Sequence, residues 1–266
     1  MDFTPTRSTF SQSLFLTSMM RVMFRPVFGW KDASVASPQS FVIDGIDGSR
    51  LEAALFKTDL PSHKGIIVLC HPFMKYGMSY FSKNNFAESL TNMGYHVVTF
   101  NFKGFGRSSI GGPCFADDVI SAVKWASGEF PQSHIHLLGF SFGGYNAIHA
   151  LARMDGFVKS AVFDSVPPFL GNFFHKGAIG ATMRHLGNSR LKVLSGTAPI
   201  EYSLTKIHRT PMLLIFGDSD AYCSDIEQAN IEKIGNFSVK TFSNAYHLEA
   251  QKKYREEYLR YIAEFL

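Results

Sequence analysis

Residues 135–145 read Ile-His-Leu-Leu-Gly-Phe-Ser-Phe-Gly-Gly-Tyr. Three of the first four residues are apolar and predict a buried strand, and a helical pattern runs from about Tyr145 to a stop signal at Gly156. Between strand and helix, Gly139-Phe-Ser141-Phe-Gly143 matches the pattern G-x-S-x-G, in which a serine stands on a sharp strand-to-helix turn. The two glycines keep Cβ atoms out of the bend. We therefore expect the Ser141 hydroxyl to project above a sheet, beside a helix N-terminus that favours negative charge.

The alternation of strand and helix continues on both sides of this turn. Apolar runs that predict buried strands lie at 65–70, 97–100, 158–163, 212–216 and 237–242, and helical patterns lie at 86–93, 115–127 and 251–266. Such alternation indicates βαβ units, and therefore an α/β fold with a mainly parallel, twisted sheet and helices on both faces. Earlier in the chain, Asp47-Gly48 separates two shorter apolar runs and predicts an antiparallel hairpin.

The sequence predicts one domain with an N-terminal extension and a candidate cap. Residues 1–38 are predicted to be an N-terminal extension, and residues 39–266 to form the α/β domain. Residues 10–24 predict an amphipathic helix, too short and too interrupted by arginine to span a bilayer. We expect it to pack on the protein itself, with contact to a membrane surface as the alternative. Residues 165–209 lack a clear strand pattern and are a candidate cap or lid, with ordinary helices as the alternative.

The composition argues against some partners and compartments. The formal net charge is +4, from 26 basic and 22 acidic residues without a long basic run, so nucleic acid is not an expected partner. Three cysteines make no disulfide framework and suit a reducing compartment, so we expect a cytoplasmic location. The 26 phenylalanines and 10 methionines make an apolar binding pocket easy to build.

A serine hydroxyl is a weak nucleophile near neutral pH and needs a general base that a third group holds in place. His247 follows the last predicted strand, in a loop before the final helix, and is the candidate base. Asp220 lies in an acidic loop after the preceding strand, at the carboxyl edge of the sheet where sites in such sheets form. Asp218 competes with Asp220 in the same loop, and Asp164, after an earlier strand, is a further candidate acid.

The order Ser141, Asp220, His247, with the serine on a turn after a strand, resembles the α/β-hydrolase family over residues 41–266. Two more stretches agree with this resemblance. Leu69-Cys-His-Pro-Phe73 follows the first long strand, where many members carry His-Gly and then the oxyanion-hole residue. Residues 101–108, Asn-Phe-Lys-Gly-Phe-Gly-Arg-Ser, resemble the family's Asp-x-Arg-Gly-x-Gly-x-Ser turn.

The resemblance implies roles for particular residues. The family's spacing places the acid three residues beyond the glycine that closes the strand, here Gly217, and so selects Asp220. The family's oxyanion hole implies the backbone N–H groups of Phe73 and Phe142 as donors. Pro72 stands where the family usually has glycine and has no N–H, so Met74 is the alternative to Phe73.

These residues predict a serine hydrolase that cleaves a carboxylic ester, thioester or related acyl bond through an acyl-enzyme. The expected substrate is a small hydrophobic molecule, and no metal or organic cofactor is expected. Aromatic residues suggest an apolar acyl pocket: Phe73, Tyr76, Phe142 and the Phe-rich residues 165–175. The alternatives are a peptidase, an acyltransferase or a carbon–carbon bond hydrolase on the same triad, or a catalytically silent binding protein of the same fold.

Two other polar pairs have simpler interpretations. His134 and His136 alternate on a strand, but no cluster of cysteines or carboxylates accompanies them, so we expect strand histidines rather than metal ligands. Asp117 and Asp118 are expected to begin a helix rather than to act as an acid and a base.

Overall fold

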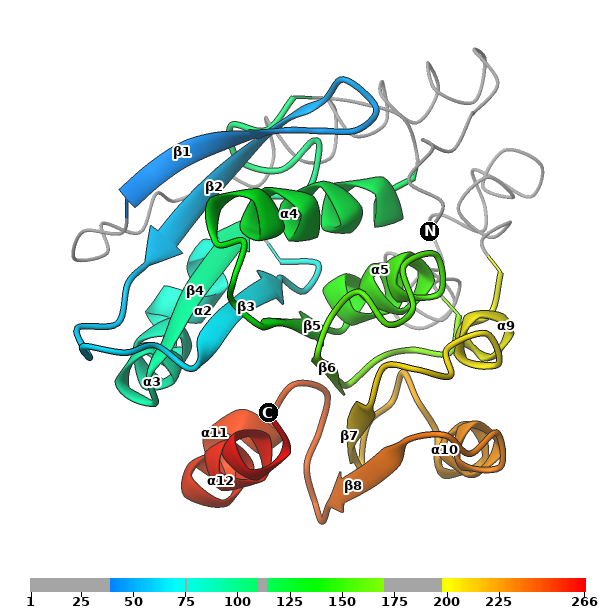
Figure 1. Cartoon of the computed structure of the whole chain (residues 1–266). Helices are drawn as coiled ribbons and strands as arrows, with labels where there is room; N and C mark the ends of the chain where they lie inside the picture. Colours follow the sequence, from blue (N-terminus) through cyan, green and yellow to red (C-terminus); the bar gives the residue numbers. More distant parts are fainter. Residues whose placement is uncertain (1–38, 75, 110–113, 170–197) are drawn as a thin grey trace.

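Eight strands form one sheet in the part of the chain that the computed structural model describes, residues 39–74, 76–109, 114–169 and 198–266 (Figure 1). Side by side, they are β1 (Gln39–Asp44), β2 (Arg50–Phe56), β4 (Tyr95–Phe100), β3 (Gly65–Cys70), β5 (Ile135–Phe140), β6 (Ser160–Asp164), β7 (Met212–Gly217) and β8 (Ser238–Phe242). β2 pairs antiparallel with both β1 and β4, and all other neighbours are parallel. The predicted α/β class, hairpin and mainly parallel sheet are confirmed.

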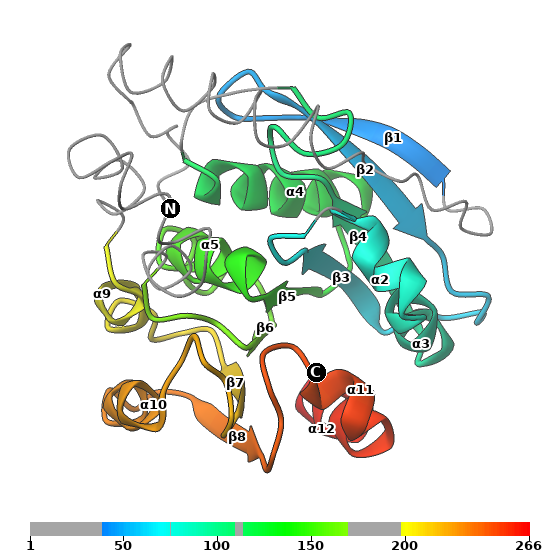
Figure 2. The same ribbon diagram turned by 180° about the vertical axis from the view of Figure 1, so that it is seen from behind.

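Helices cover both faces of this sheet (Figures 1 and 2). One core contains side chains of α4 (Ala116–Glu129), α5 (Phe142–Leu151), α9 (Ile200–Leu204) and α10 (Asp225–Glu232); the other contains those of α2 (Ser79–Lys83), α3 (Phe86–Asn92), α11 (Ala250–Lys253) and α12 (Arg255–Phe265). Successive residues of β3 enter opposite cores, Val68 the first and Leu69 the second. This burial on both faces explains why the strand is a continuous apolar run.

Some helix boundaries differ from those expected from the sequence. The helix after Ser141 begins at Phe142 rather than near Tyr145, because the Tyr145 N–H already donates to the Ser141 carbonyl at 2.9 Å. The helix expected over 251–266 is divided at Tyr254 into α11 and α12. The short helices α2 and α10 were not expected. None of the helices within the described ranges combines the length and the apolar character needed to cross a membrane.

Two predicted segments lie wholly or partly outside the residues that the structure describes. The amphipathic helix expected over 10–24 lies outside the described residues, as does the rest of the 1–38 extension. Of the candidate cap over 165–209, the structure describes residues 165–169 and 198–209, the second of which includes α9.

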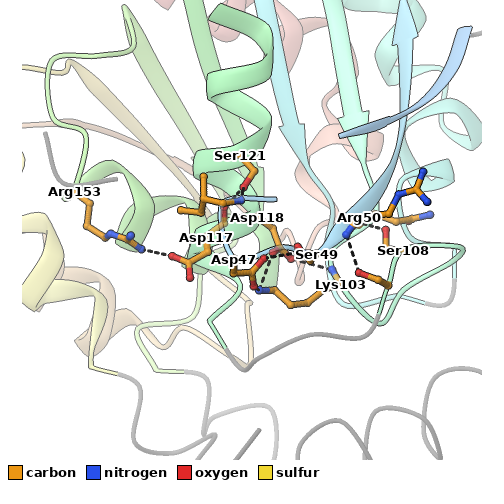
Figure 3. Close-up of polar contacts among 12 residues, drawn as sticks. Asp47, Ser49, Arg50, Lys103, Ser108, Asp117, Asp118, Ser121 and Arg153 are labelled. Carbon is orange, nitrogen blue, oxygen red and sulfur yellow. Dashed lines mark hydrogen bonds and ion pairs between the residues drawn. The ribbon is translucent and has the colours of Figure 1, made fainter. Parts of the chain in front are cut away.

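A buried group of charges joins the turn after β4 to the β1–β2 hairpin and to α4 (Figure 3). The Lys103 ammonium contacts the carboxylates of Asp47 and of Asp118, the latter at 3.0 Å, and its side chain is fully buried. Burial disfavours the ammonium ion, but the two carboxylates outweigh burial and raise the pKa of Lys103. Asp117 pairs with Arg153 at 2.6 Å. Asp117 and Asp118 therefore begin α4, as the sequence predicted, and attach it to neighbouring elements.

Lys103→Met is expected to lower the free energy of unfolding by about 3–5 kcal/mol, because it leaves the fully buried Asp118 carboxylate and the partly buried Asp47 carboxylate without their counter-charge. Urea unfolding followed by circular dichroism measures the change. Arg107→Met is the control: this side chain is 75% exposed and lies 3.8 Å from Glu52, so we expect a loss below about 1 kcal/mol. Equal losses in the two variants would contradict a stabilising role for the buried group.

Candidate active site

Ser141 lies on the turn between β5 and α5, where the parallel strands end. Its backbone φ of 52° and ψ of −117° fall in a region that residues with a side chain rarely adopt. Neighbouring backbone leaves no room for side chains on either side of it. A Cβ on Gly143 would lie 2.6 Å from the His71 carbonyl oxygen, and one on Gly139 would lie 2.6 Å from the Cα of Gly144. Both glycines of the G-x-S-x-G pattern are therefore required by close backbone approach.

Three residues from three loops meet at this turn. Ser141 Oγ lies 2.8 Å from His247 Nε2, and His247 Nδ1 lies 2.8 Å from Asp220 Oδ2. Because a carboxylate only accepts hydrogen bonds, Nδ1 carries the imidazole proton and Nε2 accepts from the Ser141 hydroxyl. The Asp220 side chain is fully buried, whereas that of His247 is 17% exposed. The structure thus brings together the serine, the histidine and the acid expected from the sequence.

The loops that carry Asp220 and His247 are held against each other. The Tyr222 N–H donates to Asp220 Oδ1 at 2.8 Å, and the Tyr222 ring meets the His247 ring edge-on, with centroids 4.8 Å apart. Gly217, which ends β7, permits this approach, since a Cβ there would lie 2.7 Å from the Ala245 carbonyl carbon. Tyr222 was not predicted, and a tyrosine two residues after the acid carries no recognisable signal.

The two rival acids make other contacts. Asp218 is exposed and accepts a hydrogen bond from the Ser219 hydroxyl at 3.0 Å. Asp164 is fully buried and accepts from the hydroxyls of Ser165 at 2.9 Å and Tyr258 at 2.8 Å. The bond to His247 Nδ1 comes from Asp220, in agreement with the acid that the family's spacing selects.

The orientation of the peptide group between Pro72 and Phe73 is fixed by hydrogen bonds to its carbonyl oxygen. The Pro72 carbonyl accepts from His71 Nδ1 and from the Met74 N–H, both at 2.8 Å. In a trans peptide the carbonyl and the following N–H point in opposite directions, so these bonds direct the Phe73 N–H away from both donors. The Met74 N–H is already engaged, which favours Phe73 as the candidate oxyanion donor. The Phe142 N–H begins α5 and has no acceptor within its own helix.

His71 supports this peptide group as a neutral imidazole. Its Nε2 accepts from the Phe102 N–H at 3.2 Å, while Nδ1–H donates to Pro72. Burial lowers the pKa of His71 to about 4, so the ring stays neutral near physiological pH. This supporting role was not predicted. The available signal was a histidine directly after a buried strand, in a stretch already singled out for its resemblance to the family.

Several apolar side chains near the candidate site in sequence are exposed. Phe73 and Met74 are 39% and 40% exposed, and Tyr246, adjacent to His247, is 65% exposed. Phe142, by contrast, is only 4% exposed, close to the 2% of Ser141 itself, and its place in an acyl pocket stays a prediction. It packs against a group of other aromatic rings: Phe73, Phe102, Phe105 and Phe115. Of the Phe-rich residues 165–175, those from 170 onward lie outside the described part of the chain.

No group of three metal-ligating side chains occurs among the residues that the structure describes. His136 lies on β5, and its Nδ1 is 2.8 Å from Ser160 Oγ. Cys70, at the end of β3, is fully buried.

Comparison with known families supports the same architecture. Residues 65–175 match a family model described as alpha/beta hydrolase fold. Two curated relatives from Escherichia coli, both described as an uncharacterized 31.7 kDa protein in the traX-finO intergenic region, are 30% identical over 95 residues. The alignments cover 33% of this chain and 32% of each relative, so the chain matches about a third of their length.

Solved structures resemble almost the whole chain. An esterase of Pyrococcus furiosus has a TM-score of 0.70 at 20% identity, over 90% of this chain and 94% of the esterase. The α/β hydrolase GrgF of a Penicillium species has a TM-score of 0.71 at 16% identity, over 86% of this chain and 98% of its own. A Xanthomonas campestris protein described as a serine hydrolase without lid has a TM-score of 0.59 at 18% identity, over 86% and 91% of the two chains. At such identities the likeness shows the fold alone.

Proposed function

We propose that this chain, whose residues 65–175 match a family model described as alpha/beta hydrolase fold, is a serine hydrolase of that family and cleaves a carboxylic ester, thioester or related acyl bond. The observation that carries the proposal is the continuous line of hydrogen bonds from Ser141 through His247 to Asp220. Here a strained serine donates to an imidazole, and the imidazole donates to a buried carboxylate. This arrangement activates a hydroxyl for attack on an acyl carbon.

In the proposed reaction, Ser141 Oγ attacks the acyl carbon while His247 Nε2 takes its proton. Asp220 stabilises the resulting imidazolium and keeps the ring oriented. The N–H groups of Phe73 and Phe142 donate to the developing oxyanion, and their geometry is set before the substrate binds. His247 then returns the proton to the leaving group, and the acyl-enzyme forms. Water, deprotonated by the same histidine, attacks the acyl carbon and releases the acid and Ser141.

A fluorophosphonate probe tests the proposal, because it reacts with an activated serine and leaves an inert one unmodified. We expect stoichiometric labelling at Ser141, located by mass spectrometry of the digested protein. Absence of labelling would indicate a catalytically silent protein of this fold. Turnover of an activated ester with methanol added as an acceptor separates hydrolysis from acyl transfer, since an acyltransferase would form the methyl ester in preference to the acid.

The exposed apolar side chains of Phe73, Met74 and Tyr246 support a hydrophobic substrate. Each methylene removed from water contributes about 0.8 kcal/mol. We therefore expect kcat/KM for p-nitrophenyl esters to rise from acetyl to medium acyl chains and then to level off. Steady-state kinetics over a series of chain lengths measures this. A strict preference for acetyl, or for charged acyl groups, would contradict a hydrophobic site.

A further inference from the structure

Asp164 and Ser165, at the carboxyl end of β6, contact both halves of the candidate site. The Asp164 carbonyl accepts from the Ser141 N–H at 2.8 Å. The Ser165 hydroxyl oxygen accepts from the Leu248 N–H, next to His247, at 3.0 Å. One dipeptide therefore bonds the backbone of the nucleophile turn and the backbone of the histidine loop.

The Ser165 hydroxyl can accept this bond because its own proton is directed elsewhere. It donates to Asp164 Oδ1 at 2.9 Å, and Tyr258 donates to the other carboxylate oxygen at 2.8 Å. Asp164, Ser165 and Tyr258 are each at most 1% exposed, so no water competes for these groups. Burial raises the pKa of Asp164 to about 6. At a pH about two units higher it is a carboxylate that only accepts, which leaves a hydroxyl lone pair directed at Leu248.

The backbone at both ends of the Ser165–Leu248 hydrogen bond is strained, which indicates that surrounding contacts keep these residues in place. Ser165 has a φ of 53° and Leu248 a φ of 60°, both in the left-handed region that favours glycine. Such conformations persist where the surroundings hold them in place, and they gather at functional sites. The Ser165 N–H is also fixed, since it donates to the Ile215 carbonyl of β7 at 2.9 Å. The bond to Leu248 thus extends from a rigid strand end to a strained residue beside the imidazole.

From this geometry we infer that Ser165 is a positioning residue of the active site, whose hydroxyl holds the His247 loop in register with Ser141. The inference rests on the proposed function and adds to it a residue outside the triad. The Ser165 hydroxyl bonds the Asp164 carboxylate and the Leu248 N–H. It acts through Leu248, by restricting where the base can lie relative to the nucleophile.

Removal of the hydroxyl tests this role. Ser165→Ala keeps the Cβ and the left-handed backbone but leaves the Leu248 N–H without its acceptor. We expect kcat for an activated ester to fall about 10²-fold, with KM within about two-fold, because small displacements of a catalytic group have losses of that order. Ser165→Gly loses the same hydroxyl while relaxing the backbone, so it should fold readily and lose at least as much rate. Recovery of the wild-type rate in Ser165→Gly would overturn the inference.

Ser160→Ala is the matched control. It removes a buried hydroxyl from the opposite end of β6, where Ser160 bonds His136 at 2.8 Å. It should lower the melting temperature about as much as Ser165→Ala does and leave kcat unchanged. An equal loss of kcat in Ser160→Ala and Ser165→Ala would show a general loss of stability and would contradict positioning.

A spectroscopic readout does not depend on turnover. The His247 Nδ1–H, bonded to Asp220, should give a low-field proton resonance in the wild-type protein and in Ser160→Ala, and a shifted or broadened one in Ser165→Ala. If the wild type lacks Ser141-dependent activity but this pattern holds, the proposed function fails and the positioning role stands. If the wild type is active and Ser165→Ala keeps both its rate and its resonance, the positioning role fails and the function stands.

Discussion

Ser141→Ala is expected to lower kcat for an activated ester by about 10⁶-fold, the loss produced when the nucleophile of a serine protease is removed. The fold should be preserved. Alanine keeps the Cβ that serine already has at a φ of 52°, so the backbone strain is unchanged, and the hydroxyl that is lost bonds a histidine whose side chain is still 17% exposed. Steady-state kinetics and thermal melting of the purified variant measure both effects. Residual catalysis by the oxyanion donors is expected.

Fluorophosphonate labelling of the same variant is the control. Labelling should disappear together with the activity. A variant that keeps a near-native rate, or that is still labelled stoichiometrically at another serine, would remove Ser141 from the mechanism.

Asp220→Asn is expected to lower kcat by about 10⁴-fold with KM little changed, as in the serine protease that provides the precedent. Asparagine has the same shape but can turn its NH₂ group toward His247 Nδ1. The ring then carries its proton on Nε2, where it no longer accepts from the Ser141 hydroxyl at 2.8 Å. Kinetics at saturating and at low substrate concentrations separate the effect on kcat from the effect on binding.

Asp218→Asn is the matched control in the same loop. Its side chain is exposed and bonds Ser219, so we expect an unchanged rate and a change in the free energy of unfolding within about 0.5 kcal/mol. A severe loss of kcat confined to Asp218→Asn would move the acid to that position. Little loss in either variant would direct attention to Asp164.

Patterns over a few neighbouring residues were sufficient to predict the fold class. The sequence contains an apolar run typical of a strand buried on both faces, then a turn that needs Gly139 and Gly143, then a helix. This succession leaves few alternatives to a parallel α/β sheet. The order of Ser141, Asp220 and His247, each just after a predicted strand, placed all three at one edge of that sheet. The carboxyl ends of parallel strands lie at the same edge of a sheet, so the proximity of these three residues was predictable from the order of the elements.

The tertiary structure decided what depends on distances across the sheet. Ser141 and His247 are 106 residues apart, and their 2.8 Å contact depends on loop conformations that no local pattern specifies. The same holds for the bond that links Ser165 to the histidine loop, 83 residues away. The contacts of the Phe142 ring with Phe102 and Phe115 also depend on tertiary packing, because an aromatic side chain next to Ser141 suits a pocket or a core equally well and its sequence neighbours do not specify which rings it meets.

For the buried charges, too, the sequence predicted the local elements but not the contact between them. The sequence showed Lys103 in a turn and Asp118 at the start of a helix, each ordinary at an exposed position. Only packing brought them to 3.0 Å with no exposed side chain. Hydrophobic periodicity and glycine spacing act over a few neighbouring residues and can be recognised in the chain itself, whereas hydrogen bonds and ion pairs between distant segments act over about 3 Å and exist only once the whole sheet has formed.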